Sequence, residues 1–223
     1  MIGTSALAIW LALDPAGEED FNTWYPRQHL PERLSVPGFL RGRRYRAVGG
    51  GPPYFTLYEL ADARVLSSPA YLERLNHPTD WTRRVLPGIR GAVRNGCALL
   101  AASEPDTVAQ HLLTVRIVPA SGREPAVRAW LAGEAIAALT ALPGVTGAAL
   151  LEQETGGTAI VTEERKLFGC EIAGGPPWVG LCEVAADPGA EAGLREFWRA
   201  WSTRLAAEAT VDFYRLMYGL RWI

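Results

Sequence analysis

The stretch GGPPYFTLYEL, residues 50–60, recurs 124 residues later as GGPPWVGLCEV, residues 174–184. Two glycines, two prolines, an aromatic residue, a leucine and a glutamate occupy the same places in both copies. Glycine and proline followed by a short run of aromatic and aliphatic residues are typical of a turn and the strand after it. The recurrence of this whole unit predicts that the chain contains two copies of one structural plan.

Other landmarks recur at a slightly shorter offset. VPGFLRGRRY, residues 36–45, corresponds to LPGVTGAALL, residues 142–151, and Trp24 corresponds to Trp130, in both cases 106 positions later. The offset therefore grows by 18 between the Pro-Gly turn and the Gly-Gly-Pro-Pro turn. We expect the second copy to carry an insertion of that size near residues 152–173.

Each copy is expected to form one half of the protein, at residues 1–105 and 110–223. The hydrophobic pattern and the turn residues predict the order β-α-β-β-α-β in both halves. The first half has expected strands at 5–13, 39–48, 53–61 and 91–101, and expected helices at 15–35, 69–75 and 79–86. The second half has expected strands at 111–119, 145–154, 177–185 and 211–222, and expected helices at 123–141 and 189–208. This order is the ferredoxin-like plan.

The first expected strand is apolar on both faces. Leu7, Ile9 and Leu11 alternate on one side, and Ala6, Ala8 and Trp10 alternate on the other. A sheet of such strands must be covered on both sides, and the natural cover for the side without helices is the sheet of the other half. We therefore predict an α+β protein in which tandem ferredoxin-like (βαββαβ) halves bring two antiparallel sheets together as a barrel with a cavity between them.

This architecture, together with FNTWYPRQHLPERLSVPGF at residues 21–39 and the YFTLYE strand at 54–59, resembles the dimeric α/β-barrel superfamily. The likeness is strongest to its EthD-like proteins, is carried by the WYxxxHxPER pattern, and covers the whole chain as two fused copies. It implies a barrel that binds small hydrophobic or aromatic molecules. The superfamily includes cofactor-free monooxygenases, isomerases, polyketide cyclases and haem enzymes, so the fold alone does not select a reaction.

One polar stripe stands out in the first expected helix. If residues 17–35 are helical, Asn22, Tyr25, His29 and Glu32 or Arg33 fall three or four positions apart on one face. Histidine can take or give a proton near neutral pH. We therefore predict His29 as acid/base, Tyr25 as a hydrogen-bonding group and Glu32 as its orienting carboxylate, with Asn22, Trp24 and Arg33 contacting the substrate. Two prolines, Pro26 and Pro31, predict that the helix bends or breaks near His29.

The second copy provides an internal comparison for this stripe. Trp24 corresponds to Trp130, but Tyr25 corresponds to Leu131, His29 to Ala135, Glu32 to Ala138 and Arg33 to Leu139. The fold does not need the polar stripe in order to pack, which favours a functional His29 and one asymmetric site in each chain. The alternative is a structural histidine that hydrogen-bonds Glu32 or a strand carbonyl.

Several further residues could line the same site. Arg44 and Tyr45 lie in the arginine-rich strand RGRRYR, residues 41–46, where a guanidinium could clamp a substrate carboxylate. We prefer the competing interpretation of this strand as a solvated, protected edge. Trp10, Tyr58 and Trp81 are predicted to form walls of the cavity, although core packing explains these aromatic residues nearly as well.

The composition excludes several classes of function. The chain has 223 residues, is 48% hydrophobic and carries a net charge of −2, which predicts a packed core and no strong affinity for nucleic acid or membranes. Three widely spaced cysteines argue against a disulfide scaffold and favour a reducing, cytoplasmic location. The histidines lack metal-ligand spacing and no nucleotide-binding motif is present, so we expect no metal and no cofactor.

From these observations we expect a cofactor-independent enzyme of isomerase, lyase or cyclase type, or an oxygenase variant. Its substrate would be a small hydrophobic or aromatic carbonyl or carboxylate compound held in the barrel cavity beside His29. Two alternatives stay open: a non-catalytic small-molecule-binding protein, and a stress-related oligomer whose packed barrel has no pocket. A homodimer also stays open, because the sequence does not decide whether the barrel closes within one chain or between two.

Overall fold

The strands form close to their expected positions in the computed structural model, which describes residues 1–154, 160–185 and 188–221. The first half contains β1 (Ser5–Leu13), β2 (Phe39–Ala47), β3 (Tyr54–Leu60) and β4 (Ile89–Ala102). The second half contains β5 (His111–Pro119), β6 (Val145–Gln153), β8 (Trp178–Val184) and β9 (Ala207–Arg221). A two-residue strand, β7 (Ala173–Gly174), pairs with β4 in parallel at Val93 and Arg94.

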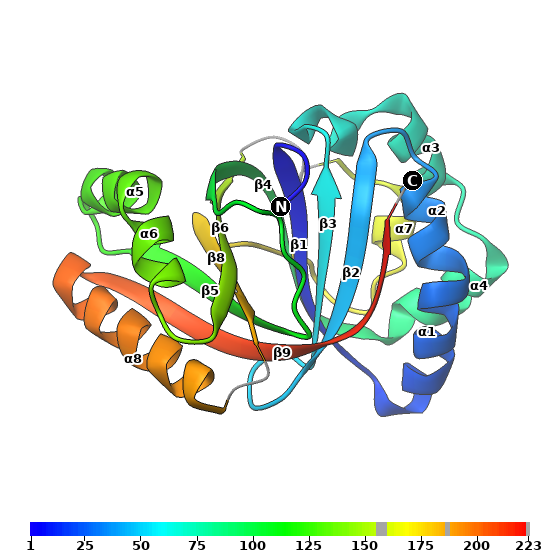
Figure 1. Ribbon diagram of the computed structural model, residues 1–223. Helices are drawn as coiled ribbons and strands as arrows, with labels where there is room; N and C mark the ends of the chain where they lie inside the picture. Colours follow the sequence, from blue (N-terminus) through cyan, green and yellow to red (C-terminus); the bar gives the residue numbers. More distant parts are fainter. Residues whose placement is uncertain (155–159, 186–187, 222–223) are drawn as a thin grey trace.

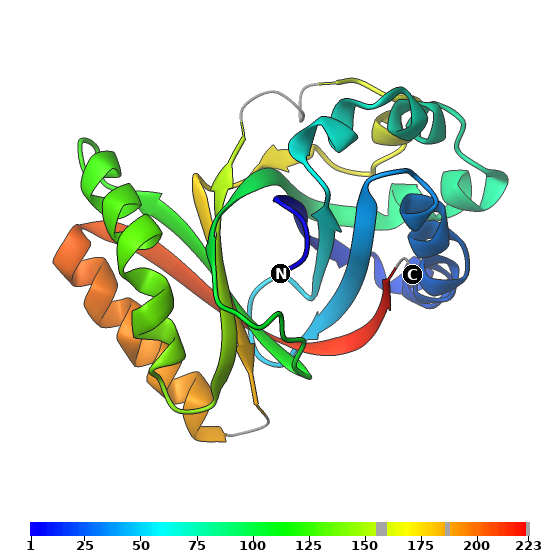
Figure 2. The same cartoon turned by 45° about the horizontal axis from the view of Figure 1, so that its top comes forward.

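The strands close into an eight-stranded antiparallel barrel within one chain (Figures 1 and 2). The order is β4-β1-β3-β2 in the first half and β9-β5-β8-β6 in the second. The pairings β2–β9 and β4–β6 join the two sheets edge to edge. The predicted α+β fold class, with antiparallel sheets and ferredoxin-like strand order, is confirmed.

Helices cover the outside of the barrel on two opposite sides (Figure 2). The first half contributes η1 (Pro15–Gly17), α1 (Glu18–Trp24), η2 (Tyr25–His29), α2 (Leu30–Leu34), η3 (Ala63–Ser67), α3 (Pro69–Asn76), α4 (Asp80–Val85) and η4 (Leu86–Gly88). The second half contributes α5 (Glu124–Gly133), α6 (Ala135–Thr140) and α8 (Pro188–Leu205). None of the helices in the described part of the chain is both long and apolar enough to cross a membrane.

One short helix lies far from its neighbours in the sequence. α7 (Glu163–Lys166) belongs to the region expected as an insertion in the second half, yet it contacts α3 of the first half. Figure 1 shows it, in yellow, among the blue and cyan helices. The segment 160–172 therefore crosses from one half to the other, and β7 fixes its end against β4.

The barrel interior is packed with side chains. The inward face of β1 presents Ala6, Ala8 and Trp10, as the alternation predicted, and these residues share a buried cluster with Tyr45 and Phe55. Trp10 and Phe55 have ring centroids 4.9 Å apart. The expectation of a ligand cavity between the two sheets is wrong where these rings pack, because aromatic side chains at inward positions fill the space that a ligand would need.

The arginine-rich strand β2 is not an edge strand. It pairs with β3 on one side and β9 on the other, and Arg41, Arg43 and Arg44 are 7%, 3% and 1% exposed. Arg41 donates to both carboxylate oxygens of Glu59 at 2.8 Å, and Arg43 donates to Glu59 at 2.9 Å. The interpretation of β2 as a solvated edge is therefore wrong, because β9, far away in sequence, supplies the missing partner strand.

Candidate functional site

The polar stripe lies on a helix with a widened turn. α1 continues into a π-helical turn, η2, and then into α2, with helical dihedral angles throughout. The Leu30 amide donates to the Tyr25 carbonyl, a spacing of five residues. Pro26 and Pro31 cannot donate backbone hydrogen bonds, and the wider turn accommodates their rings without ending the helix. The expected break near His29 is therefore wrong: a π turn at Tyr25–His29 joins the two helical segments.

His29 sits at the end of this turn with its ring packed against two aromatic rings. Its centroid lies 4.4 Å from that of Trp24 and 4.8 Å from that of Tyr25. Among the described residues, its buried Nδ1 has no hydrogen-bond partner. Burial, with the positive charges of Arg33 and Arg44, lowers the pKa of His29 well below its usual value of 6.5, so the imidazole is neutral at physiological pH. The alternative of a structural histidine hydrogen-bonded to Glu32 or to a strand carbonyl has no support in this geometry.

The carboxylate nearest to His29 comes from the second half of the chain. Glu164 on α7 places Oε1 3.9 Å from His29 Nδ1, about 1 Å beyond hydrogen-bond length. Glu164 is 4% exposed, and both of its oxygens accept from Arg33 Nη2, at 2.8 and 2.6 Å. Burial raises the pKa of Glu164 against the opposing effect of Arg33. We regard the pair as ionised, because the guanidinium satisfies both carboxylate oxygens.

A pocket opens beside these groups, between the outer face of the first sheet and the helices. It has a volume of about 100 Å³ and is partly open to solvent. β1 and β4 contribute its sheet wall, η3 and α3 contribute aliphatic side chains, and the segment 160–172 covers it. Three residues predicted from the sequence line it directly: His29, Arg33 and Tyr58.

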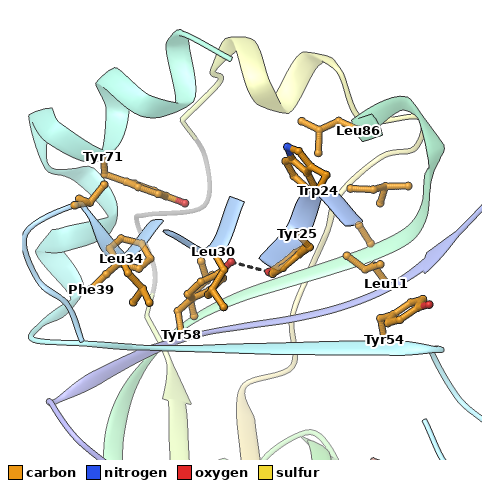
Figure 3. Close-up of a cluster of buried hydrophobic side chains, with 14 of the residues drawn as sticks. Leu11, Trp24, Tyr25, Leu30, Leu34, Phe39, Tyr54, Tyr58, Tyr71 and Leu86 are labelled. Carbon is orange, nitrogen blue, oxygen red and sulfur yellow. Dashed lines mark hydrogen bonds between the residues drawn. The ribbon is translucent and has the colours of Figure 1, made fainter. Parts of the chain in front are cut away.

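Tyr58 connects the pocket to a buried tyrosine behind it. The Tyr58 and Tyr25 hydroxyls are hydrogen-bonded at 2.6 Å, and Figure 3 shows this bond within the aromatic cluster between helix and sheet. The Tyr25 hydroxyl also donates to Thr56 at 3.3 Å. Burial raises the pKa of both tyrosines, that of Tyr58 well above 10, so both phenols keep their protons.

Arg44 and Asn22 form a second buried group behind Tyr25. The Arg44 guanidinium lies 4.3 Å from the Tyr25 ring centroid, 4.4 Å from that of Tyr54 and 4.8 Å from that of Phe21. Arg44 Nη2 donates to Asn22 Oδ1 at 2.9 Å. This cation is stabilised chiefly by aromatic faces and one amide, and it acts on the pocket through Tyr25 and through the pKa of His29.

The remaining predicted residues lie away from the pocket. Trp24 is fully buried behind His29. Trp10 and Tyr45 point into the barrel, on the opposite face of the sheet. Trp81 on α4 donates from its indole to Asp20 at 2.8 Å, and Glu32 is half-buried on α2. The structure does not bring these side chains together with His29, apart from Trp24, and their roles stay predictions.

Sequence reasoning missed five polar residues of the pocket: Tyr71, Arg94, Thr162, Glu164 and Arg165. Tyr71 is on α3, Arg94 is on β4, and Glu164 is in the insertion. The increase of 18 in the repeat offset indicated the insertion in the second copy. The first copy has no corresponding segment, so the insertion can contribute to the site of the first copy. The sequence did not predict where in the fold the insertion lies.

The residues of the pocket give no support for a metal or haem site. Haem iron needs an axial side chain, and His29, the one histidine lining this pocket, is held between the rings of Trp24 and Tyr25. The last helix of the second half, α8, carries no histidine. Within the described residues, no group of three or more His, Cys, Asp or Glu is arranged to hold a metal ion. Neither a metal nor haem therefore takes part in the proposed chemistry.

The barrel with helices on both sides defines a class of α+β protein with solved members. No protein-family model and no curated sequence matches the chain. An anthrone oxidase-like protein matches with a TM-score of 0.64 and 13% identity over 97% of this chain and 92% of that one. A protein of Fusobacterium nucleatum provisionally assigned as a monooxygenase matches with a TM-score of 0.58 and 10% identity over 99% and 96%.

A third solved structure carries a different assignment. A protein provisionally assigned as a chlorite dismutase matches with a TM-score of 0.57 and 12% identity over 97% of this chain and 96% of that one. At these identities the likeness concerns the fold. The assigned activities differ among the three solved structures, so the function has to be inferred from the residues of the site.

Proposed function

We propose that this protein is a cofactor-independent enzyme that acts on a small hydrophobic or aromatic carbonyl compound in the pocket beside His29. The observation that carries the proposal is the half-buried, neutral His29 at the wall of an apolar pocket, whose buried Nδ1 lacks a hydrogen-bond partner among the described residues. Buried polar groups in proteins are almost always paired, and an unpaired one in a pocket is a candidate for chemistry.

In this proposal His29 accepts a proton from a carbon next to the substrate carbonyl. A neutral imidazole has one lone pair available, and Glu164, 3.9 Å from Nδ1, would stabilise the imidazolium that forms. Arg33 holds Glu164 in place. Glu164 thus takes the orienting role that the sequence suggested for Glu32.

Tyr58 would steady the negative charge that develops on the substrate oxygen. Its phenol keeps its proton, and when Tyr25 donates to Tyr58 in place of Thr56 the proton of Tyr58 is free to point into the pocket. Return of the proton from His29 to another atom of the substrate completes an isomerisation, a cyclisation or an elimination. With an electron-rich phenol, molecular oxygen can be the co-reactant instead. The monooxygenase and anthrone oxidase-like assignments of similar structures support this oxygenase variant.

We further propose that the chain is a tandem fusion of two EthD-like units with one functional site. The matching strand orders of the two halves and the recurring Gly-Gly-Pro-Pro turns support the fusion. The loss of the polar stripe in the second half supports a single site, since Ala135 and Leu131 stand where His29 and Tyr25 are expected by the repeat.

A second candidate function is small-molecule binding without turnover. The pocket is largely aliphatic apart from one polar end, which suits sequestration as well as catalysis. The third expectation, a structural oligomer, required a packed barrel and no pocket. The packed barrel interior agrees with it, and the pocket beside His29 does not.

The test is a screen of small phenols, aromatic acids and lactones by thermal shift, followed by mass spectrometry of each hit under air and under nitrogen. We expect ligands to raise the melting temperature by mass action. We expect turnover to fall by about 10²- to 10⁴-fold in His29→Gln. His77→Gln is the matched control, because His77 is exposed at the end of α3, outside the pocket.

Two results would count against the proposal. Equal turnover in His29→Gln and the wild type would remove His29 from the chemistry. Tight binding with no product under either atmosphere would favour the binding protein instead.

A further inference from the structure

We infer that the ligand of this pocket is a monoanion, a small apolar molecule with one carboxylate, whose charge is received by Arg33 and Arg94. This inference rests on the proposed function, because it names the charge and shape of the ligand for the same pocket. It adds that the polar end of the pocket selects negative charge.

Arg33 lines the pocket, and one of its donor groups has no partner among the described residues. Its side chain is buried, and a single nitrogen, Nη2, donates to both oxygens of Glu164. Nη1 is buried as well and, among the described residues, has no hydrogen-bond partner. A guanidinium presents its donors as a planar fork that matches a carboxylate. Glu164 accepts from Nη2, and Nη1 is left to donate to a ligand.

Arg94 supplies a second positive charge at the same end. It lies on the outward face of β4, where Ile9 of β1 is its partner in register, and it is half-buried. It lines the pocket together with Arg33 and acts electrostatically on Glu164. Its strand position is fixed on both sides, since β7 pairs with β4 at this residue.

The charges in this part of the pocket do not balance. Arg33, Arg94 and Arg165 contribute three positive charges to the lining, Glu164 contributes one negative charge, and His29 is neutral. A net positive charge beside an apolar cavity is costly until an anion is bound. A carboxylate on the ligand offsets part of this charge, and its two oxygens match the donors of a guanidinium. The chemistry therefore fits a carboxylate better than a neutral or cationic group.

The rest of the lining sets the shape of the ligand. Leu7 and Ile9 of β1, Leu72 of α3, and Phe168 and Ile172 of the covering segment give aliphatic and aromatic walls. A flat apolar ring with a carboxylate at one end matches a cavity of about 100 Å³ with a charged end.

The test uses three molecules of almost the same shape and different charge: benzoate, benzamide and benzamidinium. Binding to the intact protein at pH 7.5 is measured by calorimetry and by ligand-observed nuclear magnetic resonance. We expect benzoate to bind about tenfold more tightly than benzamide, and benzamidinium to bind most weakly, because charge-assisted hydrogen bonds are the stronger ones.

Two substitutions move the charge in opposite directions. Glu164→Gln removes the internal carboxylate and should tighten benzoate binding about tenfold. Arg94→Gln removes a cation and should weaken it about tenfold. Benzamide binding should change little in either variant. Arg74→Gln is the control, because Arg74 is exposed on α3 and does not line the pocket.

The outcomes separate this inference from the function it rests on. Equal binding of benzoate and benzamide, or benzoate affinity unchanged in Arg94→Gln, would overturn the monoanion and leave the pocket as a site for neutral ligands. Failure of all three molecules to bind would count against both the pocket and the anion.

Discussion

His29 shows how one half-buried side chain makes the stability of the protein depend on pH. Burial and the charges of Arg33 and Arg44 lower its pKa in the folded protein, whereas in the unfolded chain it titrates near 6.5. Below that pH the unfolded chain binds a proton at His29 that the folded protein does not bind. The free energy of unfolding therefore falls as the pH drops. This contribution is fully present above about pH 7 and is lost as pH falls through 6.5.

We therefore expect His29→Gln to flatten the pH dependence. Between pH 7.5 and 5.5 the wild type should lose about 1.4 kcal/mol more of its unfolding free energy than the variant, as measured by urea denaturation. His77→Gln, on the exposed side of α3, should follow the wild type. Parallel curves for His29→Gln and the wild type would mean that the pKa of His29 is the same in the folded and unfolded protein.

Strand β2 shows which elements the sequence could predict. Alternation and turn residues placed all eight barrel strands to within a few positions, because those signals are local. The burial of Arg43 and Arg44 could not be predicted, because it depends on β9 pairing with β2 across the whole chain. The same holds for the pocket: the WYxxxHxPER helix identified His29 and Arg33, but the partner carboxylate, Glu164, is 131 residues from Arg33 in sequence.

Two adjacent arginines of β2 should respond differently to the same substitution. Arg43→Met leaves the buried carboxylate of Glu59 with fewer donors and removes the partner of Glu183, which should cost about 3–5 kcal/mol. Arg44→Met keeps the apolar contact with the rings around it and breaks no ion pair among the described residues, so its cost should be below about 2 kcal/mol. Urea denaturation of the two variants measures this difference. Equal losses would show that the aromatic faces hold Arg44 as strongly as carboxylates hold Arg43.

At the scale of the whole molecule, two features join the halves. The pairings β2–β9 and β4–β6 close the barrel, and its interior cluster draws side chains from both sheets. In addition, the segment 160–172 of the second half covers the pocket of the first, where Glu164 meets Arg33. Neither half alone contains a complete site, and a separated half would expose two unpaired strand edges and one apolar face of its sheet.

A cut between Thr107 and Val108, in the connection between β4 and β5, tests this dependence. Fragments 1–107 and 108–223 should each fail to unfold cooperatively on their own, because unpaired edges and an uncovered apolar face favour aggregation. Mixed in equal amounts, they should form a 1:1 complex that elutes with the intact chain and regains its circular dichroism. Glu164→Gln in the second fragment should weaken the complex, since it removes a buried ion pair between the halves, whereas Glu196→Gln, on the exposed face of α8, should not. A stable homodimer of fragment 1–107 would contradict this expectation, because it would show that the first sheet closes a barrel with its own copy and needs neither β6 nor β9.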